Sequence, residues 1–322
     1  MSTPLFNIVR FSDPIMSTLP TFDAAATARL LDFGALIEAL SLAAHQLEAG
    51  AIRSPVRTAV PLAENGVLLS MPAAADDIAI HKLVSVCPGN GARNMPTIFG
   101  TVTVCDGVTG APEFILDGPT VTGRRTAALS MLGVKRLYPR APRAFLLVGT
   151  GQQARHHMAA IARLHPGAPI FVAGRALESE QRFCNEAARE GIRALPANGT
   201  IAESIDVVVT TTTSKTPVYD EPARADRLIV AVGAFTPDAA EIGPDTVRAS
   251  RVFVDDFEAA REEAGDLLQA GVDWSSVRPI GAAITDGAPA NEPVLLKTVG
   301  SGAWDLAACR VARAAIASLP NQ

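Results

Sequence analysis

The chain has 322 residues, of which 48% are hydrophobic and 19% charged, and it carries a formal net charge of −5 at pH 7. This length suffices for two domains, or for one large domain with a sizeable core. The sequence contains no dense run of Lys and Arg and no stretch of about 18 apolar residues. We therefore expect neither nucleic acid nor a membrane among its partners.

Two features of the sequence concern the cellular compartment. Residues 1–20 lack the basic region, apolar core and cleavage site that together make a signal peptide. None of the cysteines stands in a CxxC pair, so the metal and redox spacings are absent; they are Cys87, Cys105, Cys184 and Cys309. Scattered cysteines are typical of a reducing compartment. The sequence therefore predicts a cytoplasmic protein without a metal site.

The first third of the chain predicts a helix followed by a sheet. Residues 23–50 have a helical pattern, in which Asp32 can cap a helix and Gly50 ends it. From residue 57 to residue 116 the pattern changes to short β-like runs, which include 66–71, 78–86 and 97–105. The stretch 106–110 (DGVTG) between two of these runs predicts a hairpin turn.

From residue 120 onwards, helices and buried strands alternate. A helix is expected over 120–137, beginning near Thr120 or Thr122. Apolar strands are expected at 144–148, 170–173, 206–210, 228–232 and 251–254, with a helix at 177–189 and further helical segments between them. This alternation predicts an α/β fold with a Rossmann-type, doubly wound parallel sheet. The last segment, 303–319, predicts an Ala-rich helix.

A glycine-rich turn follows the first of these strands. Residues 149–154 (GTGQQA) fit the pattern G-x-G-x-x-A. The first glycine allows a tight turn, the second lets the backbone approach a pyrophosphate, and Ala154 permits close packing of helix on strand. The amino end of the next helix offers free N–H groups to phosphates. Because the motif lies between a predicted strand and a predicted helix, it predicts a dinucleotide site.

The end of the second strand bears on the choice of nucleotide. Folds that select NAD usually carry Asp or Glu at this point, which binds the ribose 2′-hydroxyl. Here the strand ends in residues 172–175 (VAGR), and Arg175 stands where a 2′-phosphate would lie. A guanidinium suits a phosphate by charge and by its fork of donors. We therefore expect NADPH, while NADH stays possible because Glu178 could also face the ribose.

Four stretches of the chain together resemble the ornithine cyclodeaminase/mu-crystallin superfamily. They are residues 54–58 (SPVRT), 81–90 (HKLVSVCPGN), 122–128 (TGRRTAA) and the glycine loop. Further stretches that resemble the family lie at 232–241, 254–255, 263–265 and 299–307. The resemblance covers most of the chain in the right order, and the second and third stretches are far more specific than a glycine motif alone.

The resemblance implies a homodimer of two-domain chains. An α+β substrate-binding and dimerisation domain would comprise residues 1–121 with about 295–322, and the Rossmann domain residues 122–294. It also implies that Arg57, Lys82 and Arg125 surround a substrate carboxylate, which agrees with the need of a carboxylate for cationic, bidentate donors. We expect the cofactor to contact Thr97, Arg125, Thr126, Gly149, Gly151, Gln152, Gln153, Arg175, Thr212, Val232 and Ser301.

Lys82 is the best candidate for the catalytic residue. It can interact with the imino acid and supply or organise a proton. His81, next to it, is less suitable, because neighbouring residues of a β-strand point to opposite faces. If Lys82 faces the site, His81 does not.

Phe235 marks a departure from the enzymes that give the superfamily its name. In ornithine cyclodeaminases an aspartate follows the Gly-Gly of the loop after the fifth strand and works on the substrate amine. Counting back from Glu241, that position is Phe235 here. A phenyl ring accepts no proton and binds no ammonium, but it can pack against an apolar substrate ring. Phe235 is therefore a candidate substrate contact and argues against cyclodeamination of ornithine.

The mu-crystallin branch of the superfamily also lacks this aspartate and reduces cyclic ketimines. The resemblance therefore predicts reduction of Δ1-pyrroline-2-carboxylate to L-proline and of Δ1-piperideine-2-carboxylate to L-pipecolate by NAD(P)H. Three alternatives stay open on the sequence: an alanine or N-alkylamino-acid dehydrogenase, an ornithine cyclodeaminase, and a non-catalytic binding protein of the mu-crystallin type. Retention of Lys82 and Arg125 argues against the last of these.

Overall fold

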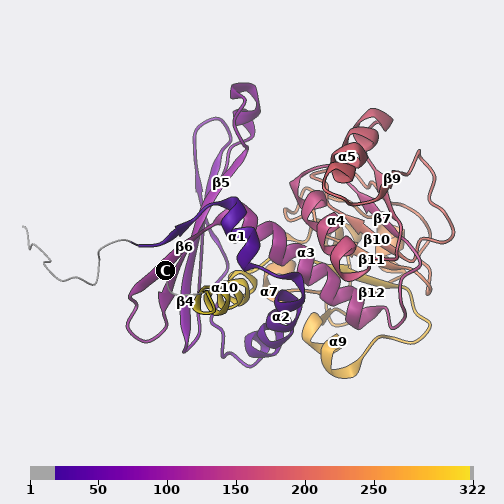
Figure 1. Cartoon of the computed structure of the whole chain (residues 1–322). Coiled ribbons are helices and arrows are strands. Elements are labelled where there is room, and N and C mark those ends of the chain that lie inside the picture. Colours follow the sequence, from indigo (N-terminus) through magenta and orange to yellow (C-terminus); the bar gives the residue numbers. More distant parts are fainter. Residues whose placement is uncertain (1–18, 320–322) are drawn as a thin grey trace, which may run out of the picture.

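Two β-sheets lie side by side in the computed structural model, which describes residues 19–319 (Figure 1). The first sheet has the strand order β1-β6-β5-β4-β3-β2 and is antiparallel except for the β1–β6 pair. Its strands are β1 (Thr21–Phe22), β2 (Thr58–Pro61), β3 (Val67–Ala74), β4 (Ile78–Val86), β5 (Ile98–Asp106) and β6 (Pro112–Asp117). Residues 1–18, most of the segment for which we expect no signal peptide, lie outside the described part.

The second sheet is parallel throughout, with the order β13-β12-β14-β11-β10-β7-β8-β9. The chain runs from β7 outward to β9, returns to β10 on the other side of β7 and continues to β13, which is the doubly wound arrangement. The predicted fold class is confirmed. The strands are β7 (Phe145–Val148), β8 (Ile170–Ala173), β9 (Ala194–Pro196), β10 (Val207–Thr210), β11 (Leu228–Ala231), β12 (Arg251–Val254), β13 (Arg278–Pro279) and β14 (Val294–Lys297).

The sequence pattern did not indicate three strands of this sheet, the short β9 and β13 and the central strand β14. Strand β14 lies between β11 and β12, at the centre of the sheet, and all four of its side chains are buried, including that of Lys297. A four-residue apolar run that ends in a lysine is too short for its periodicity to identify it as a strand. Its place in the sheet is therefore set by tertiary pairing rather than by a local signal.

The helices of the first lobe begin at aspartates. The expected helix over 23–50 is two helices, α1 (Ala24–Leu30) and α2 (Phe33–Glu48). Asp32 has an extended backbone, and its carboxylate accepts from the N–H groups of Gly34 and Ala35 at 2.9 and 3.1 Å. The predicted cap at Asp32 is thus confirmed, and the same cap interrupts the longer helix.

Helix α3 (Gly118–Leu137) runs between the two lobes (Figure 1) and packs on β5 and α2 on one side and on α4 (Gln152–Leu164) on the other. The expected helix over 120–137 is confirmed, and it begins two residues before Thr120, at Gly118. Asp117 is the cap, because its carboxylate accepts from the N–H of Thr120 at 2.8 Å. Pro119 in the first turn needs no such acceptor, since it has no N–H.

The remaining helices complete the two lobes. Helix α10 (Gly302–Ala317) returns to the first sheet and packs on α2, β3 and β4. The others are α5 (Leu177–Arg189), α6 (Pro244–Arg248), α7 (Phe257–Glu263), α8 (Gly265–Ala270) and α9 (Ile280–Asp286) with the short 3-10 helix η2 (Pro88–Arg93). The domain division expected from the sequence stays a prediction.

Within residues 19–319 no single helix has the length and apolar character needed to cross a membrane, whereas α1 and α2 pass that test only as a pair bent by 71°. All four cysteines are free thiols. The cytoplasmic location stays a prediction.

Two histidines of α4 make the stability of the fold depend on pH. His157 is fully buried, with Nε2 2.9 Å from Ser130 Oγ and Nδ1 2.7 Å from the carbonyl oxygen of Gln153. Burial lowers its pKa to about 4. Burial, and then the charge of Arg124, lowers the pKa of the neighbouring His156 to about 4 as well. Both side chains therefore stay neutral in the folded protein under mildly acidic conditions.

Below a pH of about 6.5 the unfolded chain takes up protons that the folded chain does not, so the free energy of unfolding should fall as the pH falls toward 4. For His157 alone we expect a loss of about 2 kcal/mol between pH 7 and pH 5. Urea unfolding at both pH values, on the wild type and on His157→Gln, measures it. The variant should lose correspondingly less than the wild type, and equal losses in both would contradict the assignment.

Candidate active site

Lys82 lies in the middle of β4 with its side chain on the face of the sheet that the helices cover. Ile80, Lys82 and Val84 are buried, whereas His81 and Leu83 between them are exposed, so the strand alternates as expected. Lys82 Nζ donates to Asp305 Oδ2 at 2.5 Å and lies 3.4 Å from Thr122 Oγ1. His81 faces the other way, with Nε2 2.8 Å from Ser70 Oγ. The predicted opposition of Lys82 and His81 is confirmed.

Asp305 joins Lys82 to Arg125. It lies in the first turn of α10 and is fully buried, as is Lys82 apart from 2% of its surface. Its second oxygen, Oδ1, accepts from Arg125 Nε at 3.0 Å. Among the described residues, the two terminal nitrogens of Arg125 have no hydrogen-bond acceptor, and they lie beside Gly300. Arg125 therefore presents a fork of donors that is available for a carboxylate.

Arg57 reaches the same region from the segment before β2. Its Nη2 donates to Glu263 Oε2 at 2.7 Å and to the carbonyl oxygens of Val299 and Gly300 at 2.9 and 3.1 Å. Glu263 ends α7 of the second lobe, so this contact joins the two lobes at the loop after β14. The loop itself is held by Asp255, whose carboxylate accepts from the N–H groups of Val299 and Gly300, each at 2.9 Å.

The three cations influence one another. Burial lowers the pKa of Lys82 to about 8; the charges of Arg125 and Arg57 act in the same direction, and Asp305 opposes them. Burial by itself would raise the pKa of Asp305, but the charges of Lys82 and Arg125 outweigh it and hold that pKa below its ordinary value. Lys82 is thus largely protonated at neutral pH and gives up its proton more readily than an exposed lysine.

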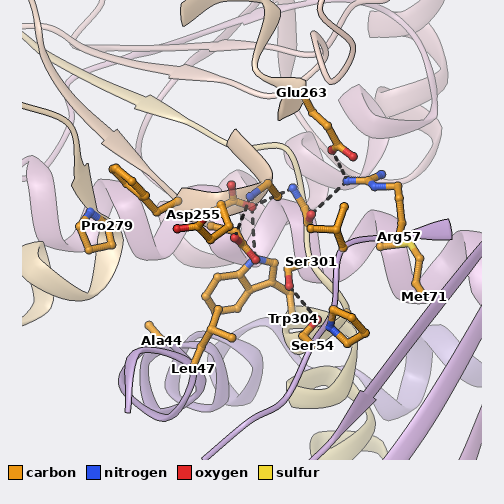
Figure 2. A pocket seen from close by; sticks show the side chains of 18 of the residues that line it. Ala44, Leu47, Ser54, Arg57, Met71, Asp255, Glu263, Pro279, Ser301 and Trp304 are labelled. Atoms are coloured by element: carbon orange, nitrogen blue, oxygen red, sulfur yellow. Dashed lines mark hydrogen bonds and ion pairs between the residues drawn. The ribbon is translucent and has the colours of Figure 1, made fainter. Parts of the chain in front are cut away.

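A cavity of about 390 Å³ opens beside this cluster (Figure 2). Arg57 and Glu263 meet at one end, Trp304 and Asp255 lie in the middle, and Ala44 and Leu47 of α2 form another wall. Neither Lys82 nor Arg125 lines it, so the cavity touches the cation cluster only through Arg57 and the backbone of Gly300. Its lining further includes Ser54, Val56, Met71, Asp256, Phe257, Pro279, Ile280 and Ser301.

The glycine turn after β7 has the geometry that a pyrophosphate requires. Gly149 has a φ of +121°, which disfavours any side chain, and a Cβ there would lie 2.6 Å from Thr211 Oγ1. A Cβ on Gly151, which begins α4, would meet no atom within 4 Å. No side chain caps this helix, and Gln153 Oε1 is buried without a partner in the described part of the chain. The free N–H groups and the open approach fit a dinucleotide.

Arg175 is exposed at the end of β8, next to this turn. The acid near it is Glu180, whose buried carboxylate accepts from the N–H groups of Gly174 at 3.0 Å and Asn198 at 3.1 Å. Both oxygens are therefore occupied by the backbone. Glu178, which kept NADH possible on the sequence, is exposed.

The structure gathers most of the other expected cofactor residues at the carboxyl edge of the parallel sheet. Gln152 lies in the first turn of α4, while Thr212 and Val232 follow β10 and β11. Ser301 caps α10, and Thr126 is buried on α3. Thr97 is exposed and lies apart from these residues. It precedes Val102, the strand partner of Lys82, by five residues, which corresponds to roughly 17 Å in an extended strand.

Similarity to known proteins identifies the family of this chain. The family model for the ornithine cyclodeaminase/mu-crystallin family matches residues 22–318, nearly the whole chain. The chain belongs to the ornithine cyclodeaminase/mu-crystallin family. The resemblance noted in the sequence is thereby confirmed.

Within this family, the chain is similar to the Δ1-pyrroline-2-carboxylate/Δ1-piperideine-2-carboxylate reductase of Azospirillum brasilense, with 53% identity over 94% of this chain and 98% of the relative. The fold is shared with Δ1-pyrroline-2-carboxylate reductase of Thermococcus litoralis, solved with NADH and L-proline (TM-score 0.83, 24% identity, 93% and 98% coverage). It is also shared with an archaeal alanine dehydrogenase dimer with bound NAD (TM-score 0.82, 23% identity, 93% and 96% coverage).

The acids of this family member were the part of the site that the sequence analysis missed. Asp305 was quoted only as part of a family stretch, although it is an acid in the first turn of an otherwise Ala-rich helix. An acid in such a helix predicts a buried partner, because an unpaired buried carboxylate is costly. Glu263 and Asp255 likewise lay within family stretches, at 263–265 and 254–255, but stand at the ends of elements and had no helical context of this kind.

Proposed function

We propose that this chain is a nicotinamide-dependent reductase of cyclic imino acids, which converts Δ1-pyrroline-2-carboxylate to L-proline and Δ1-piperideine-2-carboxylate to L-pipecolate. The observation that carries the proposal is the convergence of Lys82, Arg125 and Arg57 around Asp305 and the loop at Gly300. The printed name of the Azospirillum relative, at 53% identity, supports the same two substrates. Structural relatives solved with NADH and NAD agree with a nicotinamide cofactor.

The charges of the cluster suit an anionic substrate. Three cations, Lys82, Arg125 and Arg57, contact two carboxylates, those of Asp305 and Glu263. One positive charge is therefore left without a partner among these ion pairs. It is available at Arg125, whose terminal nitrogens have no acceptor among the described residues. A substrate carboxylate supplies the missing negative charge and two oxygens for the fork.

Lys82 would act on the nitrogen of the substrate. A protonated imine accepts hydride far better than a neutral one, because the positive charge on nitrogen makes the adjacent carbon electron-poor. A protonated Lys82 with a pKa of about 8 can donate or organise this proton near neutral pH. Arg125 and Arg57 would fix the carboxylate and so orient the reacting carbon. The nicotinamide, when bound, supplies the hydride.

A substrate panel tests the proposal. The purified protein should oxidise NADPH or NADH with each cyclic imino acid and yield L-proline or L-pipecolate. Pyruvate with ammonia, the reaction of an alanine dehydrogenase, should give little turnover, because no ring fills the site. Rapid turnover of pyruvate with ammonia and none of either cyclic imine would overturn the proposal.

L-Ornithine provides the second arm of the panel. Phe235 follows β11 and is 40% exposed. By the count back from Glu241, it stands at the position where cyclodeaminases carry an aspartate. With L-ornithine and catalytic NAD we expect no ammonia. We propose that Phe235 packs instead against the apolar ring of the substrate. Efficient release of ammonia would mean that another acid of this chain replaces the missing aspartate.

We propose NADPH as the preferred cofactor, with Arg175 as the residue that contacts its 2′-phosphate. Arg175→Ala should raise the dissociation constant of NADPH about tenfold, since one charge-assisted contact is lost, and should leave that of NADH nearly unchanged. Titration of cofactor fluorescence with wild type and variant measures both constants. Equal changes for the two cofactors would remove Arg175 from this role.

The pH profile should depend on Asp305. Because the reaction needs protonated Lys82, kcat/KM should fall as the pH rises through about 8, the pKa of Lys82. Asp305 favours the charged ammonium. Asp305→Asn should therefore move this descending limb to lower pH by about one unit or more. A limb that stays in place in a folded variant would show that Lys82 does not set it.

A homodimer is also proposed. Within residues 19–319 no helix covers the face of the first sheet opposite Lys82. Val60, Leu83 and Phe99 lie on this face by register, with exposed fractions of 50%, 38% and 47%. An apolar sheet face of this kind favours burial against a second copy. Sedimentation at micromolar concentration should give a dimer. A monomer at that concentration would contradict the proposal.

A further inference from the structure

Two loops touch each other at the carboxyl ends of the central strands. One follows β10 and contains Thr212; the other follows β11 and contains Gly233. A Cβ on Gly233 would lie 1.8 Å from the carbonyl oxygen of Thr212 and 2.5 Å from its nitrogen. The two backbones are therefore packed so closely that only glycine fits at this point.

Glu241 binds both loops at once. Its side chain is fully buried, with Oε1 accepting from the N–H of Thr212 and Oε2 accepting from the N–H of Gly233, each at 2.5 Å. A carboxylate is the side chain that can do this, since both of its oxygens accept and neither donates. The two N–H groups would otherwise be left without partners at the end of a strand.

Glu241 is itself fixed from below. Asp266 Oδ1 accepts from the N–H groups of Glu241 and Ile242 at 2.5 and 2.9 Å. Asp266 Oδ2 lies 2.7 Å from Lys297 Nζ, and both of these side chains are fully buried. Burial raises the pKa of Glu241, and the charge of Lys297 opposes that rise. The cluster thus holds two carboxylates and one ammonium directly beneath the loops.

The position of these loops relative to the glycine turn suggests what they carry. In a doubly wound sheet a dinucleotide lies across the carboxyl edge at the point where the strand order reverses, here between β7 and β10. Arg175 at the end of β8 marks the adenosine side. The opposite half then lies over β10 and β11, on the side of Gly300 and the cation cluster.

We propose that Glu241 is a positioning residue, which clamps the loops at Thr212 and Gly233 into one rigid surface for the nicotinamide ring. The inference rests on the proposed function, because it assumes a nicotinamide cofactor. It assigns no contact between Glu241 and the cofactor; Glu241 acts through the two backbone N–H groups. Lys297 and Asp266 hold Glu241 in the orientation that reaches both loops.

Glu241→Gln tests the clamp, since the amide keeps one acceptor but turns an NH₂ group toward one of the two N–H groups. The variant should bind the preferred cofactor about tenfold more weakly. The matching cofactor fragment that lacks the nicotinamide is ADP-ribose for NADH, or its 2′-phosphate for NADPH. The dissociation constant of this fragment should stay within about twofold of the wild-type value. The kcat for Δ1-pyrroline-2-carboxylate should fall about tenfold or more, with a smaller change in the KM of the imine.

Asp206→Asn is the matched control. Asp206 is equally buried and also accepts from a backbone N–H, that of Arg143 at 2.7 Å. It lies at the amino ends of the parallel strands, directly before β10, and thus at the end of the sheet away from the loops. This variant should have a lower melting temperature, but its affinities for the cofactor and for the fragment should change by the same factor. If Glu241→Gln weakens cofactor and fragment equally, or weakens neither, the clamp is refuted.

Amide hydrogen exchange of the wild type gives a test that needs no variant. Peptides that contain Thr212 and Gly233 should be strongly protected even without cofactor, and rapid exchange at both would refute the clamp should Glu241→Gln fail to fold. The two proposals fail in different ways. If the wild type reduces no imine with NAD(P)H, the proposed function is overturned. If the wild type is active but the exchange or binding results contradict the clamp, only the role of Glu241 is overturned.

Discussion

Replacing Lys82 by Met should lower kcat/KM for Δ1-pyrroline-2-carboxylate about a thousandfold. General acids contribute roughly two to four orders of magnitude to enzymatic rates. Lys82 is the ammonium group that shares Asp305 with Arg125, the arginine proposed to bind the substrate carboxylate. Methionine fills the space of the lysine stem in the buried site. Steady-state kinetics at pH 7 on the folded variant, verified by circular dichroism, measure the effect.

Lys82→Arg separates two roles of Lys82, the donation of a proton and the positive charge that pairs with Asp305. A guanidinium keeps the ion pair with Asp305, but its pKa is too high for proton donation at neutral pH. We expect this variant to retain the fold and the binding of cofactor while its kcat falls nearly as far as that of Lys82→Met. If either variant kept more than about a tenth of wild-type kcat/KM, Lys82 would not be the proton donor.

Arg125→Ala should lower kcat/KM about a hundredfold, chiefly through a higher KM for the imino acid. In the proposed role, the lost group would donate charge-assisted hydrogen bonds to the substrate carboxylate in a desolvated site, and such bonds are worth about 3 kcal/mol. The same change removes a charge that lowers the pKa of Lys82. The descending limb of the pH profile should therefore also move to higher pH.

Arg124→Ala is the control for Arg125, because the two arginines are neighbours on α3 but contact different partners. The guanidinium of Arg124 lies 4.0 Å from the ring centroid of Phe33, and its Nε donates to the carbonyl oxygen of Leu31 at 2.8 Å. Its loss should cost stability and leave the KM of the imino acid unchanged. Equal KM values for wild type and Arg125→Ala would refute the carboxylate contact.

The parallel sheet and the glycine turn could be predicted because their signals are local. The apolar run at 145–148, the two glycines and the helix that follows are contiguous in the sequence, and the expected strand at 170–173 and helix at 177–189 agree with the structure residue for residue. The cap at Asp32 was visible for the same reason. Where one residue and its immediate neighbours determine a structure, the sequence suffices.

The ion pairs of the site could not be predicted in this way, because each joins distant segments. Asp305 meets Lys82 from 223 residues away and Arg57 meets Glu263 from 206 residues away. The central strand β14 depends likewise on its pairing with β11 and β12. Motif resemblance identified the cations as a set, but their carboxylate partners became visible only once the fold had brought them together.

In the proposed reaction, hydride passes from the nicotinamide to the imine carbon next to the carboxylate. The most direct measurement uses reduced cofactor that carries deuterium in the transferable C4 position, with Δ1-pyrroline-2-carboxylate as substrate and mass and NMR spectra of the product. We expect L-proline with one deuterium at C2 and none elsewhere. L-Proline without deuterium at C2, or consumption of the cofactor without formation of proline, would contradict it.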